Sequence, residues 1–161
     1  MAKSSNKKTF WFVIPVLTII SLLVVACGQS PAQTGTTVKH SAAVKQANPF
    51  AALPKNADGF TDISIEQLAE SLPEKNYTLV NVHIPYAGDL PQTDFSIPFN
   101  EIANYQDQLP DKDALVVLYC RSGNMSTQAA QTLVELGYTN VVEVDGGMAA
   151  WQAAGYQLVD K

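Results

Sequence analysis

The run 114–119, "ALVVLY", restricts the fold of this chain more than any other segment, because every residue in it is apolar. A strand with one face in water alternates apolar and polar residues, whereas an unbroken apolar run is typical of a parallel strand covered on both faces. Residues 126–136 then place alanine, leucine and valine at helical spacing before Gly137, a common helix stop. A buried strand followed by a helix predicts an α/β fold.

Strands and helices alternate through the rest of the C-terminal two thirds of the chain. The segments "YTLVNVH" and "VVEV" are rich in β-branched residues and predict two more strands, at 77–83 and 141–144. Helices are expected at 65–72, with a Ser64–Gln67 capping box, at 101–109, capped by Asn100, and at 146–155. This order predicts a mainly parallel sheet, and ligands bind such sheets beyond the carboxyl ends of the strands.

The N-terminal segment has the pattern of an export signal. Three lysines within the first eight residues precede the uncharged stretch 10–26, which ends in "VVACG". This ending resembles a bacterial lipoprotein signal, which implies cleavage before Cys27 and attachment of lipid to its sulfur. The alternative is an uncleaved membrane-spanning helix, but a span needs about 20 apolar residues, and this stretch is shorter and contains Pro15. We therefore expect an extracytoplasmic lipoprotein anchored to the membranes of a bacterial cell envelope.

Charge divides the remainder of the chain into two parts. All 15 carboxylates lie between Asp58 and Asp160, and residues 28–57 contain none. The predicted organisation is a signal peptide at 1–26, a lipidated cysteine and flexible tether at 27–57, and one domain at 58–161. Because a nucleic-acid-binding domain normally needs a basic patch, the acidic domain is not expected to bind nucleic acid.

The segment 120–126, "CRSGNMS", joins the buried strand to the following helix. Cys120 is one of two cysteines in the chain, and a lipidated Cys27 would leave it without a disulfide partner. Backbone N–H groups of the loop and the positive end of the helix dipole favour thiolate over thiol at this position. The residues thus favour a nucleophile over an inert thiol. Arg121 is the only arginine of the chain, and by itself it is equally consistent with an anion-binding group and with an incidental loop residue.

Three segments of the sequence resemble a single rhodanese domain. "CRSGN" matches the start of the rhodanese active-site loop, and "LGYTNVVEVDGGMAAWQAAGY" matches the closing segment with its Gly-Gly-x-x-x-Trp signature at Gly146, Gly147 and Trp151. "LVNVHIPYAGDLPQTDFSIPF" resembles the strand and loop between them more loosely. The resemblance covers residues 59–159 and implies a rhodanese-like α/β fold, with a mainly parallel sheet of about five strands flanked by helices on both faces.

Membership of this family would imply sulfur transfer through a persulfide on Cys120. The donor would be thiosulfate or a persulfide, and the acceptor cyanide or a thiol, including that of a persulfide carrier. An alternative is a catalytically weak module that binds or senses persulfide or docks a protein partner. We expect a monomer that needs no metal or cofactor. The substrate-binding residues expected from the resemblance are Arg121, Ser122, Gly123, Asn124, Met125 and Ser126. Four further residues are expected to support this loop without contacting the substrate: Asn81, His83, Gly146 and Gly147.

Three positions depart from the rhodanese pattern. Met125 stands where the family often has a cation or threonine, which disfavours an anionic donor such as thiosulfate relative to a less charged persulfide. Asn81 and His83 replace an Asp and Arg pair that is expected to brace the active loop. His83 can supply similar hydrogen bonds, although a histidine that merely ends a strand is equally consistent with the sequence.

Overall fold

The fold is an α/β domain in a computed structural model that describes residues 47–160. Five strands form one parallel sheet in the order β1-β5-β4-β2-β3. The strands are β1 Thr61–Ile63, β2 Thr78–Asn81, β3 Phe95–Ser96, β4 Leu115–Tyr119 and β5 Asn140–Val144. The helical elements are α1 Ile65–Ser71, η1 Leu72–Glu74, η2 Phe99–Tyr105, α2 Asn124–Glu135 and α3 Gly147–Ala153. The predicted α/β class and parallel sheet are confirmed.

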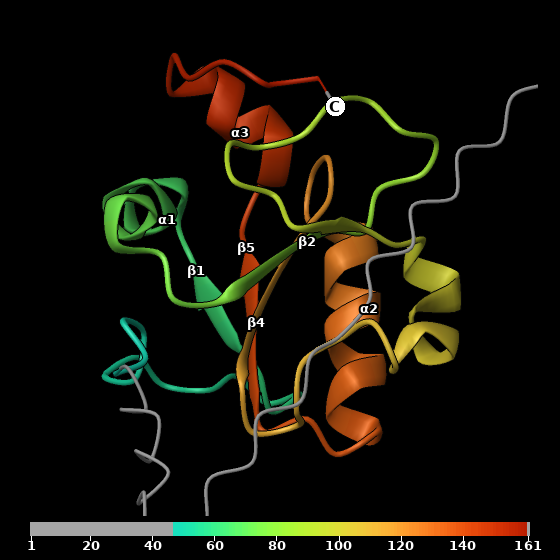
Figure 1. The fold of residues 1–161 in the computed structure, drawn as a ribbon. Coiled ribbons are helices and arrows are strands. Elements are labelled where there is room, and N and C mark those ends of the chain that lie inside the picture. Colours follow the sequence, from blue (N-terminus) through green and yellow to red (C-terminus); the bar gives the residue numbers. More distant parts are fainter. Residues whose placement is uncertain (1–46, 161) are drawn as a thin grey trace, which may run out of the picture. The chain divides into compact units, whose positions relative to one another are not determined.

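Strand β4 explains why the sheet is covered on both faces. It pairs with β5 on one side and β2 on the other, so its backbone groups are used within the sheet. Val117 and Tyr119 belong to one buried cluster with residues of α1 and α3, whereas Val116 and Leu118 belong to a second cluster with residues of α2 and η2. The unbroken apolar run therefore supplies both cores, and helices cover both faces (Figure 1).

The packed part of the chain extends N-terminal to the boundary predicted at Asp58. Phe50 is only 5% exposed and lies in the cluster beneath α1, with its ring centroid 5.8 Å from that of Tyr77. Residues 47–57 contain no acidic side chain, so the shift in charge does not coincide with the start of the core. The predicted signal peptide at 1–26, the lipidated Cys27 and the tether as far as residue 46 lie outside the described residues. Within 47–160, no helix is long and apolar enough to cross a bilayer.

The helix expected at 101–109 is instead the 3₁₀ helix η2, and Asn100 does not cap it. Its N-cap is Pro98, and no side chain caps the helix. A 3₁₀ helix has three residues per turn, so residues spaced by three lie on one line. Phe99, Ile102 and Tyr105 have this spacing, and all three pack in or against the cluster beside α2. Apolar contacts with α2 therefore favour the tighter helix over the predicted α-helix. The Ser64–Gln67 capping box of α1 is present as predicted.

Candidate active site

Cys120 directly follows β4, and its sulfur lies beneath the loop that leads into α2. Sγ accepts hydrogen bonds from the Gly123 N–H at 3.2 Å and from the Ser126 hydroxyl at 3.3 Å. Gly123 precedes α2 with φ +100°, a conformation that favours glycine, and this turn aims its N–H at the sulfur. Ser126 lies in the first turn of α2 and is fully buried. The loop thus places a backbone donor and a side-chain donor at the sulfur.

These donors oppose the effect of burial on the thiol. Burial raises the pKa of Cys120, but hydrogen bonds from the Ser126 hydroxyl and from the backbone N–H groups of Ser122, Ser126 and Gly123 lower it, and the net shift is downward. A lowered pKa increases the fraction of thiolate, which is the nucleophilic form. Cys120 is also the only free cysteine among the described residues. It therefore has the electrostatic environment of a reactive cysteine.

Replacing Ser126 by alanine is expected to raise the Cys120 thiol pKa and to slow its alkylation at neutral pH by about tenfold, because the thiolate loses one hydrogen bond. The measurement is the rate of reaction with iodoacetamide at Cys120, resolved by peptide mass spectrometry. Thr127→Val is the matched control, since the Thr127 hydroxyl donates to the Gly123 carbonyl and not to sulfur. Equal rates for the two variants would contradict a role for the Ser126 hydroxyl.

The first residues of α3 hold the backbone of the Cys120 loop from the other side. The Met148 N–H donates to the Cys120 carbonyl and the Ala149 N–H to the Arg121 carbonyl, both at 2.9 Å. This approach requires Gly147, whose φ is +49°, because a Cβ there would lie 2.1 Å from the Cys120 carbonyl oxygen. At Gly146, φ is +72° and a Cβ would lie 2.6 Å from that of Ala150. The two glycines named from the family signature therefore lie behind the loop and allow α3 to contact it.

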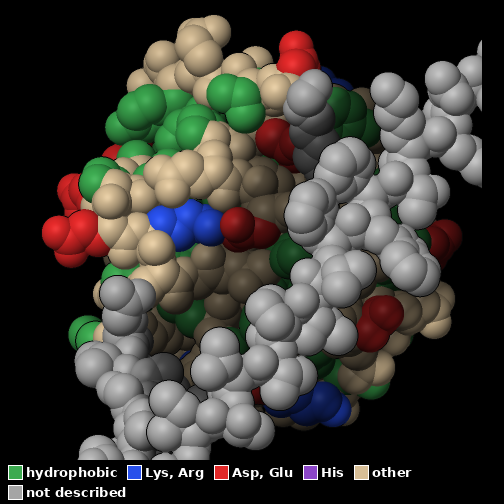
Figure 2. Space-filling model, in the orientation of Figure 1, with side chains coloured by type: hydrophobic (Ala, Val, Ile, Leu, Met, Phe, Trp, Pro, Cys, Tyr) green, Lys and Arg blue, Asp and Glu red, His purple; other side chains and the backbone are tan. Residues whose placement is uncertain are grey.

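Arg121 borders a pocket on the outer side of the loop. The pocket has a volume of about 220 Å³, and it is lined by Ala87, Arg121, Met148, Gln152 and Leu158. Within residues 47–160, the exposed Arg121 side chain makes no hydrogen bond or ion pair. On the face shown in Figure 2, apolar side chains gather over α3 and the chain after it, where Tyr156 is 40% exposed. An unpaired guanidinium beside a pocket can bind the anionic end of a small molecule.

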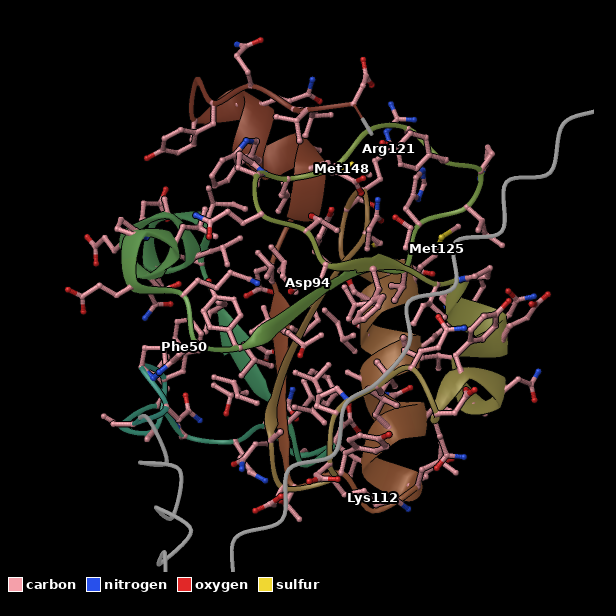
Figure 3. The ribbon with its side chains drawn as sticks, in the orientation of Figure 1. Phe50, Asp94, Lys112, Arg121, Met125 and Met148 are labelled. Carbon is pink, nitrogen blue, oxygen red and sulfur yellow. The ribbon has the colours of Figure 1, made fainter. Side chains whose placement is uncertain are left out.

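The other predicted loop residues point in different directions. Met125 is half-buried and packs against the cluster beside α2, on the side of η2, whereas Arg121 lies toward the loop after β2 (Figure 3). Asn124 is exposed, and its side-chain oxygen accepts from Gln128 on the next helical turn. Ser122 is also exposed and offers its backbone N–H to the sulfur. Of these four residues, Ser122 donates its backbone N–H to the sulfur and Arg121 lines the pocket beside the loop.

Among the described residues, the side chains of Asn81 and His83 make no hydrogen bond to the active loop. The Asn81 amide donates to the Gly88 carbonyl and the Asp89 carboxylate, and its oxygen accepts from the His83 N–H. Asn81 therefore orders its own loop, residues 83–89. His83 Nδ1 is buried without a hydrogen-bond partner, and burial and the nearby Arg121 charge lower the His83 pKa. The short, neutral Asn81 side chain is satisfied by the loop that immediately follows it.

Glu143 is a site residue that the sequence reasoning missed. It lies in β5, is 1% exposed, and accepts a hydrogen bond of 2.5 Å from the Ser126 hydroxyl. Asp62 and Asp145 are close by, and one oxygen from each of the three carboxylates lies within 4.8 Å of the others. Burial raises the Glu143 pKa, the Ser126 hydroxyl lowers it, and the charges of Asp145 and Asp62 raise it further, to about 7. The sequence did contain a signal for this residue, because a charged side chain inside the otherwise apolar strand "VVEV" indicates a buried group with a specific partner.

Comparison with known proteins agrees with this geometry. The family model for the rhodanese-like domain matches residues 50–154. A sulfurtransferase from Allochromatium vinosum is 33% identical over 102 residues, which cover 61% of this chain and 94% of that protein. The thiosulfate sulfurtransferase GlpE from Pseudoalteromonas translucida is 30% identical over 105 residues, which cover 63% and 98% of the two chains. Both relatives are matched over nearly their whole length.

Solved structures show the same similarity. A rhodanese-related protein from Thermoplasma volcanium superposes with a TM-score of 0.54 at 29% identity, over 62% of this chain and 98% of that one. A rhodanese-like domain protein from Staphylococcus aureus gives a TM-score of 0.54 at 25% identity, over 63% and 100%. The fold and the loop define an α/β domain with a cysteine of lowered pKa at the carboxyl end of a parallel sheet. The chain belongs to the rhodanese-like domain family, and the two relatives named above are sulfurtransferases.

Proposed function

We propose that the protein transfers sulfane sulfur from a small donor to a thiol or cyanide acceptor through a persulfide on Cys120. The observation that carries this proposal is the Cys120 sulfur beneath its loop, where the Gly123 N–H and the Ser126 hydroxyl donate to it and its pKa is lowered. Sulfurtransferase-named relatives at about one third identity support the same class of reaction.

The reaction consists of two displacements at sulfur. The Cys120 thiolate attacks the outer sulfur of the donor, a new S–S bond forms, and the old bond to that sulfur breaks. Sulfite or a thiolate leaves with the electron pair of the broken bond. An acceptor thiolate or cyanide then attacks the outer sulfur of the Cys120 persulfide, and the Cys120 thiolate leaves. Donors around the sulfur stabilise the anion in both the resting and the loaded state.

The charges at the site favour a persulfide of a small thiol over thiosulfate as the donor. Arg121 is the only arginine of the chain and lines the pocket beside the loop. Met125 stands where the rhodanese pattern often has a cation, and it packs against the cluster beside α2. One guanidinium must therefore offset the acidic surface for a doubly charged donor such as thiosulfate. A donor with less charge meets a smaller electrostatic penalty.

Replacing Arg121 by glutamine is expected to raise the KM for thiosulfate by about tenfold, because a charge-assisted hydrogen bond to the donor is lost. The KM for an alkyl persulfide, which carries less charge than thiosulfate, is expected to change less. Steady-state assays with both donors measure the difference. Lys112→Gln is the matched control, since it also removes one positive charge, but Lys112 lies at the opposite end of the domain (Figure 3). An equal rise in KM for both donors would argue against anion binding by Arg121.

The proposal is tested by treating the full chain with thiosulfate, and separately with an alkyl persulfide, and measuring the peptide that contains Cys120 by mass spectrometry. The expected result is a gain of one sulfur atom that disappears when cyanide or a thiol is added. Absence of the adduct with every donor would overturn the proposed function. If the adduct persists after acceptors are added, the protein binds persulfide but does not transfer its sulfur.

A module that binds or senses persulfide is the second candidate, and the burial of Cys120 is the observation that favours it. Cys120 is 1% exposed, which restricts the access of a bulky donor to its sulfur and so slows loading. Once Cys120 carries a persulfide, the outer sulfur of that persulfide would be more accessible to an acceptor than the Cys120 sulfur itself. Turnover with acceptors of increasing size discriminates the two candidates: a transferase loses rate only with the bulky ones, whereas a sensor is slow with all of them.

A further inference from the structure

The Ser126 hydroxyl has three acceptors within hydrogen-bond distance but only one proton. Its oxygen lies 3.3 Å from Cys120 Sγ, 2.9 Å from the Gly123 carbonyl oxygen and 2.5 Å from Glu143 Oε1. A hydroxyl donates one proton and accepts through its lone pairs. If Glu143 is ionised, it attracts this proton most strongly, because charge-assisted hydrogen bonds are the stronger ones. The sulfur then loses its side-chain donor.

A protonated Glu143 reverses this competition. Its carboxyl O–H can donate to Ser126 Oγ, which leaves the Ser126 proton free for the sulfur. The surroundings of Glu143 favour this form. Asp62 faces it from β1 and Asp145 from the turn after β5, while on the side of α2 it meets Ser126. No ion pair of Glu143 with Lys or Arg is present among residues 47–160, and its pKa is raised to about 7.

We propose that Glu143 is a positioning residue for Cys120: in the reactive state it carries a proton that it donates to Ser126, and this directs the Ser126 hydroxyl onto the sulfur. This inference rests on the proposed sulfurtransferase function and adds to it a residue on β5 that the active-site loop does not contain. Glu143 acts through Ser126 and contacts neither donor nor acceptor.

The proton balance of thiolate formation follows from this chain of three groups. The S–H bond of Cys120 breaks and its proton moves to Ser126 Oγ, while the Ser126 proton moves to Glu143 Oε1. A thiol and a carboxylate become a thiolate and a carboxylic acid, so the buried site holds one negative charge before and after the transfer. Two negative charges side by side without a cation would be costly there. Cys120 and Glu143 therefore titrate as a pair that shares one proton.

The test compares the pH dependence of Cys120 alkylation in the full-length chain and in its Glu143→Gln variant, resolved by peptide mass spectrometry between pH 5 and pH 9. In the parent protein, the rate is expected to rise over a wider pH interval than a single titration allows. The variant is expected to follow a single-proton curve with a lower midpoint, and to react up to about tenfold faster near neutral pH. Glu135→Gln, an exposed change on the same helix as Ser126, is expected to match the parent profile.

Identical profiles for Glu143→Gln and the parent would overturn the inference. A second comparison tests the path through Ser126: Glu143→Gln is expected to shift the profile less in a Ser126→Ala background than in the parent. An equal shift in both backgrounds would reject Ser126 as the link. Circular dichroism confirms that each variant is folded. Alkylation requires no sulfur donor, so failure here is distinguishable from failure of the proposed function, which is an absent sulfur adduct.

Discussion

Replacing Cys120 by serine is expected to reduce sulfur transfer by at least about a thousandfold, to the background rate of donor and acceptor in solution. A serine hydroxyl is not ionised near neutral pH and cannot hold sulfur as a persulfide. The fold is expected to remain, because a serine oxygen can accept from the Gly123 N–H and the Ser126 hydroxyl, as the sulfur does. The free energy of unfolding should change by about 1 kcal/mol or less. Transfer assays and urea denaturation measure the two quantities.

The control for this prediction is Cys27→Ser, which removes the only other cysteine of the chain and is expected to keep the transfer rate. If Cys120→Ser retained a tenth of the activity or more, Cys120 could not be the sulfur carrier. If instead both variants lost activity together with stability, the loss would report unfolding and not chemistry. Measuring the two variants by the same denaturation protocol separates these outcomes.

Replacing Gly147 by alanine is expected to destabilise the domain by at least about 3 kcal/mol and to abolish sulfur transfer. The new Cβ would lie 2.1 Å from the Cys120 carbonyl oxygen and 2.9 Å from the carbonyl carbon, and these backbone atoms cannot rotate away as a side chain can. The hydrogen bond from the Met148 N–H to the same carbonyl would be broken. Because that carbonyl belongs to the nucleophile itself, the loop is displaced along with α3.

Gly155→Ala is the matched control for this change. Gly155 also has a positive φ, +88°, but nothing lies within 4 Å of a Cβ placed there. The Gly155→Ala variant therefore has only the strain of a positive φ, which lowers the free energy of unfolding by about 1 kcal/mol. We expect this variant to keep the transfer rate. Denaturation midpoints and Cys120 alkylation rates give the comparison. Similar losses for both alanine variants would mean that strain, and not the contact with Cys120, explains the requirement for Gly147.

The parts of the fold that the sequence predicted are those with a strong local signal. The apolar run that became β4 and the capping box of Ser64 and Gln67 are both present as predicted. Cys120 is also placed by local signals, since the strand end, the turn residues and the helix start are adjacent in the sequence. The 3₁₀ helix η2 was predicted with the wrong period because contacts with α2, distant in sequence, select its geometry.

The residues that sequence reasoning misplaced depend on contacts between distant segments. Glu143 meets Ser126 only because β5 and the start of α2 are brought together, and the two residues are 17 positions apart. Asn81 and His83 stand where the rhodanese pattern has an Asp and Arg pair that is expected to brace the active loop, and the sequence left open whether His83 takes over that role. With His83 there, the Asn81 side chain is satisfied by Gly88 and Asp89. Pairings of this kind require the three-dimensional structure.

The central position of β4 has a consequence for how the site unfolds. Strands β5 and β2 protect its amides on both edges, and a core covers each face. Amide hydrogens of residues 116–119 are therefore expected to exchange with deuterium only when the whole domain opens, whereas those of the exposed Arg121 and Ser122 exchange through local fluctuations. The boundary between slow and fast exchange should fall at Cys120. Cys120 would then be anchored to β4, the last part of the domain to unfold, while the loop that follows it fluctuates locally.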